Sequence, residues 1–305
     1  MIDYTFTRYL AAKKTVDDRA LNAHVWDTLK RALPPPPVRV LEVGAGTGTM
    51  VERMLERQFL TGAAFTAVDA EPDNIAEARR RLCDWANTMG WEAATDSAGR
   101  LALTQSDRRA VVDLICADVF EFVERRQSRR GWDLLIAHAF LDLLDAPTAL
   151  PLLLSCLRPG GLFYFTLNFD GATILQPAID PALDAKIEAL YHRTMDGRIT
   201  GGLRSGDSQT GRRLFGHLRR ARAETLDAGS SDWVVFAGVG GYPADEAYFL
   251  HHIIHFIDGA LRGHPELDPP TFAAWIAERH AQIERGELVY IAHQLDFVGR
   301  ISAHP

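Results

Sequence analysis

The chain has few cysteines, no long apolar run and little basic charge, and each shortage excludes a class of protein. Its three cysteines are spaced neither for a disulfide framework nor for a zinc site, and each lies in an apolar periodic stretch that indicates a buried thiol. No apolar run approaches the ~20 residues of a membrane span. Residues 1–10 lack the charged and apolar regions of a signal peptide. We therefore predict a cytoplasmic protein with no membrane partner.

Acidic residues outnumber basic ones. The 305 residues include 33 Lys and Arg against 40 Asp and Glu, a formal net charge of −7. A protein that binds a phosphate backbone normally carries a basic patch. Arginines do gather at 125–130 and 212–222, but apolar residues separate them at helical spacing, as on solvated helix faces. The composition therefore predicts no nucleic-acid partner.

Short apolar strands alternate with helical stretches through the first half of the chain. This alternation predicts a mainly parallel, doubly wound α/β sheet. Four consecutive prolines, residues 34–37, end the first helix. The predicted helices are 16–33, 50–59, 73–89, 119–126 and 147–157, and the predicted strands are 38–43, 64–69, 111–117, 132–137 and 161–168.

Three stretches interrupt this alternation. Residues 91–105 predict a hairpin, 171–207 contain a helix at 181–195, and 238–286 contain helices at 244–261 and 271–285. A helix (209–222) and a strand (232–236) lie between the last two stretches. The predicted organisation is an N-terminal helical segment (1–33), a core (34–170), a cap insertion (171–207), a continued core (208–237), a helical cap insertion (238–286) and a final core strand (287–305).

A glycine-rich turn, LEVGAGTG at residues 41–48, follows the first predicted strand and begins a helix. Glycine lets the backbone bend sharply and approach a ligand, and the free N–H groups of the following helix point toward that ligand. The G-x-G-x-G spacing differs from the G-x-G-x-x-G of dinucleotide-binding proteins. Glu42, ahead of the first glycine, places a carboxylate where a cation can bind.

Carboxylates also follow the next two strands. Asp69, about 20 residues beyond the glycines, can accept hydrogen bonds from two ribose hydroxyls. Asp118 can accept from an exocyclic amine, with Val119 as an apolar wall for a purine. Asp118 equally fits a helix N-cap, and the two roles are compatible.

Four segments, 41–48, 67–72, 117–119 and 157–161, resemble the ordered motifs of class I S-adenosylmethionine-dependent methyltransferases. The resemblance covers roughly residues 38–170 and concerns cofactor and fold rather than substrate. It implies a Rossmann-like sheet of seven strands, with residues 287–298 as an antiparallel final strand, and S-adenosylmethionine as cofactor. The cofactor-binding residues that it implies or allows are Glu42, Gly44, Ala45, Gly46, Gly48, Asp69, Ala70, Asp118, Val119 and His138.

In that resemblance the glycines line the methionine portion of the cofactor, Glu42 lies by its amino end, Asp69 holds the ribose, and Asp118 with Val119 holds the adenine. N-terminal extensions of similar enzymes often fold over the cofactor cleft as a lid. Residues 4–22 are the candidate for such a lid, which would exclude water from the transfer.

Methyl transfer is an in-line displacement, so the acceptor must be aligned and, if it is protonated, must lose its proton. His138 lies just past the fourth strand, on the cleft side of the sheet, and is the first candidate for a base. It also fits a residue that caps the strand end or contacts the cofactor. Asp142 can pair with His138 or face solvent. We predict His138 and Asp142 as the catalytic residues.

Polar residues in and beside the insertions are candidates for binding the acceptor. Each also fits a packing, turn or surface role. His251 and His255 are four residues apart, a spacing that can hold a metal, but no zinc motif surrounds them and we predict no metal. The predicted substrate-binding residues are Asn168, Tyr191, Arg204, His251, His252 and His255.

The sequence thus predicts methyl transfer from S-adenosylmethionine to an oxygen or nitrogen atom of a small-molecule acceptor. No Asn-Pro-Pro-Tyr-like tetrapeptide follows the fourth strand, which disfavours methylation of nucleic-acid bases. The alternatives are protein methylation, a different S-adenosylmethionine chemistry on the same fold, a non-catalytic binding protein and, more distantly, an NAD-dependent oxidoreductase.

Overall fold

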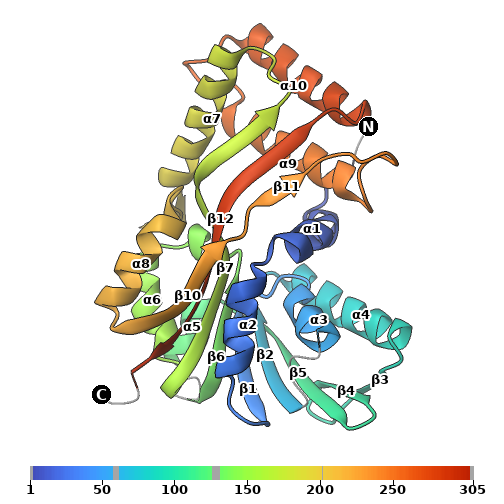
Figure 1. The fold of residues 1–305 in the computed structure, drawn as a ribbon, viewed down its shortest axis with the longest axis vertical. Coiled ribbons are helices and arrows are strands. Elements are labelled where there is room, and N and C mark those ends of the chain that lie inside the picture. Colours follow the sequence, from blue (N-terminus) through green and yellow to red (C-terminus); the bar gives the residue numbers. More distant parts are fainter. Residues whose placement is uncertain (1–2, 58–61, 126–130, 201, 303–305) are drawn as a thin grey trace.

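β1 (Val38–Val43) has buried side chains on both faces, and the sheet is built around it. Val38 and Val40 pack into one hydrophobic cluster, whereas Leu41 and Val43 pack into another. Because successive side chains of a strand point to opposite faces, both faces of the sheet must be covered. The computed structural model, which describes residues 3–57, 62–125, 131–200 and 202–302, has helices on both faces (Figure 1).

In the described residues, seven strands form the core of a 10-stranded sheet. They are β1, β2 (Gly62–Asp69), β5 (Arg108–Cys116), β6 (Trp132–His138), β7 (Leu157–Gln176), β10 (Ala223–Ser230) and β12 (Val289–Ile301). Neighbours in the order β5-β2-β1-β6-β7 are parallel. β12 lies antiparallel between β7 and β10. The parallel strands and the antiparallel final strand are therefore confirmed. The strand predicted at 232–236 forms only a short strand that pairs with β12, and β10 is the sixth strand of the core in its place.

The remaining strands extend this core. The predicted hairpin at 91–105 forms β3 (Glu92–Thr95) and β4 (Leu101–Gln105), which lengthen the sheet beyond β5. β11 (Trp233–Val235) pairs with the N-terminal end of β12. β8 (Ile199–Thr200) and β9 (Leu203–Arg204) form a separate small hairpin. The sequence did not predict β10, because its residues are mostly half-exposed and show no apolar alternation.

Two groups of helices cover the two faces of the core. α2 (Ala23–Ala32), α3 (Thr49–Glu56) and α4 (Pro72–Thr88) bury their apolar residues in one cluster. α5 (Val119–Glu124), α6 (Ala146–Leu154) and α8 (Thr210–Arg220) contribute to the other. The predicted doubly wound arrangement is thus confirmed.

The single helix predicted at 16–33 is wrong. Two helices, α1 (Phe6–Ala20) and α2, meet at Leu21 and Asn22. The side-chain oxygen of Asn22 accepts hydrogen bonds from the backbone N–H groups of His24 and Val25 and so caps α2. Asparagine at an N-cap favours a new helix start, which overrides the apolar periodicity that continues across the break.

A second layer of helices lies beyond the core, at the carboxyl ends of the parallel strands (Figure 1). β7 continues to Gln176, past the residue where an insertion is predicted to begin, and β12 accompanies it. α7 (Pro181–Asp196), α9 (Glu246–Leu261) and α10 (Pro269–Glu284) pack on this extension in a third hydrophobic cluster, which α1 shares. We call α7, α9 and α10 with the extended strands the cap.

Several composition-based predictions can be compared with the described residues. Cys156 is buried and Cys83 partly buried, but Cys116 is exposed at the end of β5, so the prediction of three buried thiols is wrong for Cys116. The arginines of α8 lie on its exposed side, whereas residues 126–130 of the other arginine group lie outside the described residues. None of the described helices is long and apolar enough to cross a bilayer.

The close pairing of β10 and β12 gives a test of the fold. A Cβ on Gly299 of β12 would lie 2.2 Å from the backbone oxygen of Glu224 and from the ring of Phe163. Gly299→Ala should therefore lower the free energy of unfolding by about 1–3 kcal/mol, the usual cost of overpacking. Urea unfolding is the measurement.

Gly259 of α9 is the matched control, because a Cβ there would meet no atom within 4 Å. Alanine is a better helix former than glycine by roughly 0.5–1 kcal/mol, so Gly259→Ala should be neutral or stabilising. Equal effects of the two substitutions would show that β10 and β12 do not approach this closely.

Candidate functional site

The glycine turn forms the tip of β1 and leads into α3. Gly44, Gly46 and Gly48 have φ angles of +66°, +53° and +77°, in the left-handed region that favours glycine. A Cβ on Gly44 would lie 2.3 Å from the ring of Phe140, and one on Gly48 would approach α4 at 3.3 Å. One on Gly46 would meet only the Leu10 side chain, at 3.5 Å. Close packing within the protein explains why residues 44 and 48 are glycine. Of the three glycines, only Gly46 has open space beside it, on the side of the turn that faces Leu10.

Glu42 is a buried acid directly behind this turn. Its side chain is 1% exposed, and Oε2 has no hydrogen-bond partner among the described residues. Burial raises the pKa of Glu42 to about 8; nearby Asp69 adds to this, and Arg53 opposes it. A buried acceptor without a donor is costly, so Glu42 is poised to bind a hydrogen-bonding or cationic group.

Asp69 ties the tip of β2 to the glycine turn. Its Oδ2 accepts the Gly46 N–H at 2.8 Å, while Oδ1 accepts from the Glu71 N–H and from Nδ2 of Asn74, both at 3.0 Å. Next to it, the buried Ala45 donates its N–H to the backbone oxygen of Val68. A carboxylate has about four acceptor positions, so Asp69 keeps capacity for a further donor.

Asp118 caps α5: its Oδ1 accepts from the N–H groups of Phe120 and Glu121. The N-cap interpretation is confirmed. An additional ligand contact stays a prediction that the cap allows, since Asp118 is exposed and the cap uses only its Oδ1. Val119 beside it is buried. Exposed Cys116, whose thiol donates to the backbone oxygen of exposed Ala70 at 3.6 Å, completes this edge of the sheet.

His138 ends β6 and is held on both sides of its ring. Nδ1 lies 2.6 Å from the Thr166 hydroxyl, and Nε2 lies 3.0 Å from both Asp17 Oδ2 and Arg53 Nη1. Burial, reinforced by the charge of Arg53, lowers the pKa of His138 to about 4 despite Asp17. The ring is therefore neutral at neutral pH, and both nitrogens are engaged within the protein.

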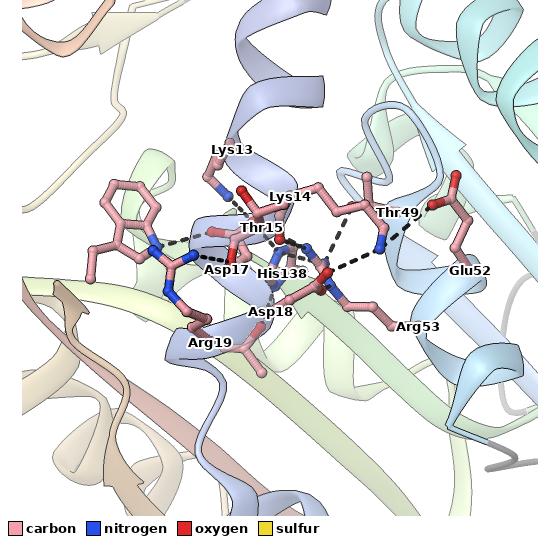
Figure 2. A network of polar contacts seen from close by, with 12 residues as sticks. Lys13, Lys14, Thr15, Asp17, Asp18, Arg19, Thr49, Glu52, Arg53 and His138 are labelled. Carbon is pink, nitrogen blue, oxygen red and sulfur yellow. Dashed lines mark hydrogen bonds and ion pairs between the residues drawn. The ribbon is translucent and has the colours of Figure 1, made fainter. Parts of the chain in front are cut away.

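Asp17 of α1 is the centre of a buried polar cluster that we call the Asp17 network (Figure 2). Its Oδ2 contacts Lys13 Nζ at 2.5 Å, Arg53 Nη2 at 3.4 Å and the His138 ring. Its Oδ1 accepts from Nε1 of Trp233, at 2.9 Å. Burial alone would raise the pKa of Asp17, but these partners lower it, so the carboxylate is ionised.

Further contacts fasten α1 to the core and to the cap. Arg53 also pairs with Asp18, through Nε. Glu246, at the start of α9, is fully buried. It accepts a hydrogen bond from the Thr15 hydroxyl at 2.7 Å and forms a bidentate ion pair with Arg19. α1 therefore spans the junction between the cap and the carboxyl ends of the core strands, with Leu10 against the glycine turn (Figure 1).

Sequence analysis did not identify Lys13, Asp17 or Arg53 as site residues. Lys13 and Asp17 are four apart on one helix, an ordinary surface pair in a sequence, and Arg53 lies within an amphipathic helix. Only their burial at 7%, 2% and 1% exposure distinguishes them. Buried charges require partners, and those partners come from elements distant in the sequence.

Asp142 lies in the turn after β6, in a short 3-10 helix (Leu141–Leu143). Its Oδ1 is buried and has no hydrogen-bond partner among the described residues. Burial raises the pKa of Asp142 to about 6, opposed by its own backbone N–H, Lys13 and Arg198. In contrast to the ring nitrogens of His138, the Oδ1 atom of Asp142 is free to accept a proton.

The other predicted acceptor-binding residues are dispersed. Asn168 is buried within β7, where Nδ2 donates to the backbone oxygen of Leu295 and Oδ1 has no partner among the described residues. Tyr191 of α7 packs on the cap cluster. Arg204 is exposed and donates to the backbone oxygen of Asp196, at 3.1 Å. Their substrate roles stay predictions.

The three histidines of α9 have different neighbours. His251 faces α10, with Nδ1 2.8 Å from His280 Nδ1 and Nε2 2.9 Å from Glu284. His252 is buried among aromatic rings, with Tyr9 at 4.7 Å between centroids. His255 stacks on Tyr4 at 4.1 Å. In the described part of the chain no group of three or more potential ligands is arranged to hold a metal ion.

Comparison with known proteins gives a family match. Residues 17–193, more than half of the chain, match the model of a family described as a methyltransferase domain. No curated protein matches the sequence.

Solved structures resemble the whole chain. A protein from Anaeromyxobacter dehalogenans described as a type II methyltransferase has 17% identity and a TM-score of 0.51, over 92% of this chain and 97% of that one. An S-adenosylmethionine-dependent methyltransferase from Thiobacillus denitrificans, in complex with S-adenosyl-L-homocysteine, has 14% identity and a TM-score of 0.45, over 97% and 99%. At such identities the likeness concerns the fold.

The buried ring of His138 predicts a pH dependence of stability. The unfolded chain takes up a proton at this residue near pH 6.5, whereas the folded protein does so only near pH 4. Stability must therefore fall as the pH falls through this interval. From pH 7.5 to pH 5 the wild type should lose about 2 kcal/mol more than His138→Gln, which cannot titrate. Urea unfolding at both pH values measures this, and equal losses would contradict it.

Proposed function

The chain belongs to the class I S-adenosylmethionine-dependent methyltransferases, and on that premise we propose that it methylates an oxygen or nitrogen atom of a small-molecule acceptor. S-adenosylmethionine is its cosubstrate and supplies an activated methyl group on a sulfonium. The chain must then bind that molecule, align the acceptor, exclude water and accept a proton where the acceptor carries one.

The buried carboxyl group of Glu42 is the strongest support for a cofactor site at the glycine turn. Its buried, unpartnered oxygen lies directly behind the glycine turn and suits the ammonium end of an amino acid. At Gly46 there is open space beside the turn, and Asp69 can accept further hydrogen bonds from ribose hydroxyls. Asp118 and Val119 would hold the adenine at the end of β5. These residues fit the cofactor in charge and hydrogen-bonding capacity.

The position of α1 supports a small acceptor. This helix lies between the glycine turn and the cap. A buried ion pair joins it to α3, and an ion pair between half-exposed Arg19 and buried Glu246 joins it to α9. An acceptor must therefore fit inside the junction of core and cap. A side chain of a folded protein would have to displace α1, which disfavours the alternative of protein methylation.

Of the two predicted catalytic residues, we propose that Asp142 accepts the proton that the acceptor loses. Its Oδ1 is free, whereas the nitrogens of His138 are engaged by Thr166 and by the Asp17 network. With a pKa near 6, Asp142 is mostly ionised at pH 7.5 and can accept a proton. His138 acts as a positioning residue that holds α1 against the core.

Glu42 gives a test of the cofactor site that needs no acceptor. Because its pKa is near 8, Glu42 is mostly protonated at pH 7, and an ammonium group bound beside it should expel that proton. Titration calorimetry of S-adenosyl-L-homocysteine in buffers of different ionisation enthalpy should show release of nearly one proton. Glu42→Gln should abolish the release and weaken binding by about 1.5–3 kcal/mol, the usual contribution of a charged hydrogen bond.

Glu224→Gln is the matched control, because Glu224 is an exposed residue of the edge strand β10. It should bind S-adenosyl-L-homocysteine like the wild type, with the same proton release. Binding without proton release would remove Glu42 from the site. Binding of NAD in place of S-adenosyl-L-homocysteine would overturn the proposed function.

A further inference from the structure

Two histidines from different helices of the cap face each other at hydrogen-bonding distance. Nδ1 of His251 in α9 lies 2.8 Å from Nδ1 of His280 in α10, and the two rings stack with their centroids 5.0 Å apart. Nε2 of His251 lies 2.9 Å from Oε1 of Glu284, one turn further along α10. His251 is buried, so these two side chains are the partners of its ring nitrogens. We call the two histidines the His251–His280 pair.

The hydrogen atoms of the neutral pair have only one consistent arrangement. Two nitrogens 2.8 Å apart need one hydrogen between them, so one histidine donates and the other accepts. The Glu284 carboxylate accepts a hydrogen bond, which requires a hydrogen on Nε2 of His251. Because a neutral imidazole carries a single N–H, Nδ1 of His251 must be the acceptor and Nδ1 of His280 the donor.

One added proton leaves this contact intact. The proton can bind Nε2 of His280, which takes no part in the contact, and Nδ1 of His280 then still donates to His251. Alternatively, the proton can convert His251 into a cation that donates from both nitrogens, to His280 and to Glu284. In both arrangements one of the two facing nitrogens keeps its lone pair, so the hydrogen bond between the rings survives.

A second added proton breaks the contact. Both rings are then cations with a hydrogen on every ring nitrogen. Two N–H groups would point at each other across 2.8 Å with no acceptor between them, and the two positive charges would repel each other. The doubly protonated rings of His251 and His280 must therefore separate.

The charged groups around the pair act in the same sense. Burial lowers the pKa of both His251 and His280. The charges of His251 and His255 lower the pKa of His280 further, whereas Asp258 of α9 and Glu284 of α10 oppose this effect. Glu284 likewise opposes the effect of burial on the pKa of His251. The carboxylates thus favour a first added proton, while burial and the neighbouring imidazoles oppose a second.

The pair lies at a contact that supports the cap. α9 packs on α10 on one side and on α1 on the other (Figure 1). Toward α1, the ring of His252 lies 4.7 Å from that of Tyr9, and Glu246 holds α1 by an ion pair. α10 is fastened to α7 by the buried ion pair of Arg279 with Asp184, at 2.7 Å. The contact between α9 and α10 therefore joins the part of the cap that holds α1 to the part that α7 holds.

We propose that the His251–His280 pair is a pH-sensitive contact, which holds α9 against α10 with up to one added proton and releases the two helices when it takes up a second. This inference does not depend on the proposed methyl transfer. It makes the cap the part of the molecule that loosens first in acid.

The direction of the effect follows from the protons that each form can bind. Once the helices separate, both rings are in water, where histidine takes up a proton near pH 6.5. Below that pH the open form binds one more proton than the closed form. Opening therefore becomes more favourable as the pH falls, by up to about tenfold for each pH unit.

The arrangement of hydrogens can be measured in the wild type by nuclear magnetic resonance, because the ¹⁵N chemical shifts of histidine distinguish the two neutral tautomers. At pH 8, His251 should carry its hydrogen on Nε2 and His280 on Nδ1. The signals missing from His251→Gln and from His280→Asn assign the two rings. The same tautomer in both rings, or the reverse arrangement, would contradict the proposal.

Hydrogen exchange of the full-length protein tests the opening itself. Between pH 7.5 and pH 5, after correction for the direct effect of pH on the exchange chemistry, the amides of α9 and α10 should lose protection by about tenfold or more. His280→Asn should keep most of that protection, because its amide can either donate to or accept from Nδ1 of His251 and cannot titrate. His24→Asn, at a histidine of α2 whose side chain is 77% exposed, is the matched control and should lose protection like the wild type.

Three results would overturn the proposal. The amides of α9 and α10 could keep their protection at pH 5, His280→Asn could lose as much protection as the wild type, or α9 and α10 could exchange no faster than β1 at pH 5. The last result would mean that the cap opens only when the whole molecule unfolds. If His280→Asn does not fold, the tautomers and the exchange of the wild type still decide. None of these results bears on the binding of S-adenosyl-L-homocysteine, so the proposed function is tested separately.

Discussion

The carboxylate of Asp17 is the interaction on which the arrangement of the site depends. It lies on α1, and its four partners come from α1 itself, from α3, from the tip of β6 and from β11. A charge taken out of water is tolerated only where such partners surround it. Removing Asp17 would leave the cations of Lys13 and Arg53 buried without their anion. The position of α1 and the burial of these two cations therefore depend on each other.

Through that unit, α1 joins two parts of the molecule with different roles. The core strands end in the glycine turn, Asp69 and Asp118, which suit a nucleoside carrying an amino acid. The cap places apolar and aromatic side chains over the same ends (Figure 1). α1 contributes to both, since Leu10 approaches Gly46 while Tyr9 joins the cap cluster. A ligand bound between core and cap, as we propose, would be kept from bulk water.

Burial sets the charge of each acidic and basic group in this region differently. Glu42 and Asp142 both have raised pKa values, yet at pH 7 the first is mostly neutral and the second mostly ionised. His138 is neutral because burial lowers its pKa, and Asp17 is ionised because its cationic partners outweigh burial. The region therefore combines an acid that would release its proton when a cation binds beside it, a carboxylate that can receive a proton, and a histidine with both ring nitrogens engaged.

The sequence alone determined the core of this protein. Alternating apolar strands and helices, the glycine turn and the acids at strand ends are local patterns, so the parallel part of the core follows from them. The antiparallel final strand and the candidate cofactor residues came from the resemblance of these motifs to those of class I methyltransferases. The break between α1 and α2 at Asn22 and the half-exposed strand β10 did not follow, because a cap residue and a weak pattern compete there with stronger periodicities. Tertiary structure alone decided that Asp142 has an oxygen without a partner while both ring nitrogens of His138 are engaged, and it brought Lys13, Asp17 and Arg53 together with His138 and Trp233. Those contacts join residues far apart in the chain, and burial, which gives each group its charge and its need for a partner, exists only once the chain has folded.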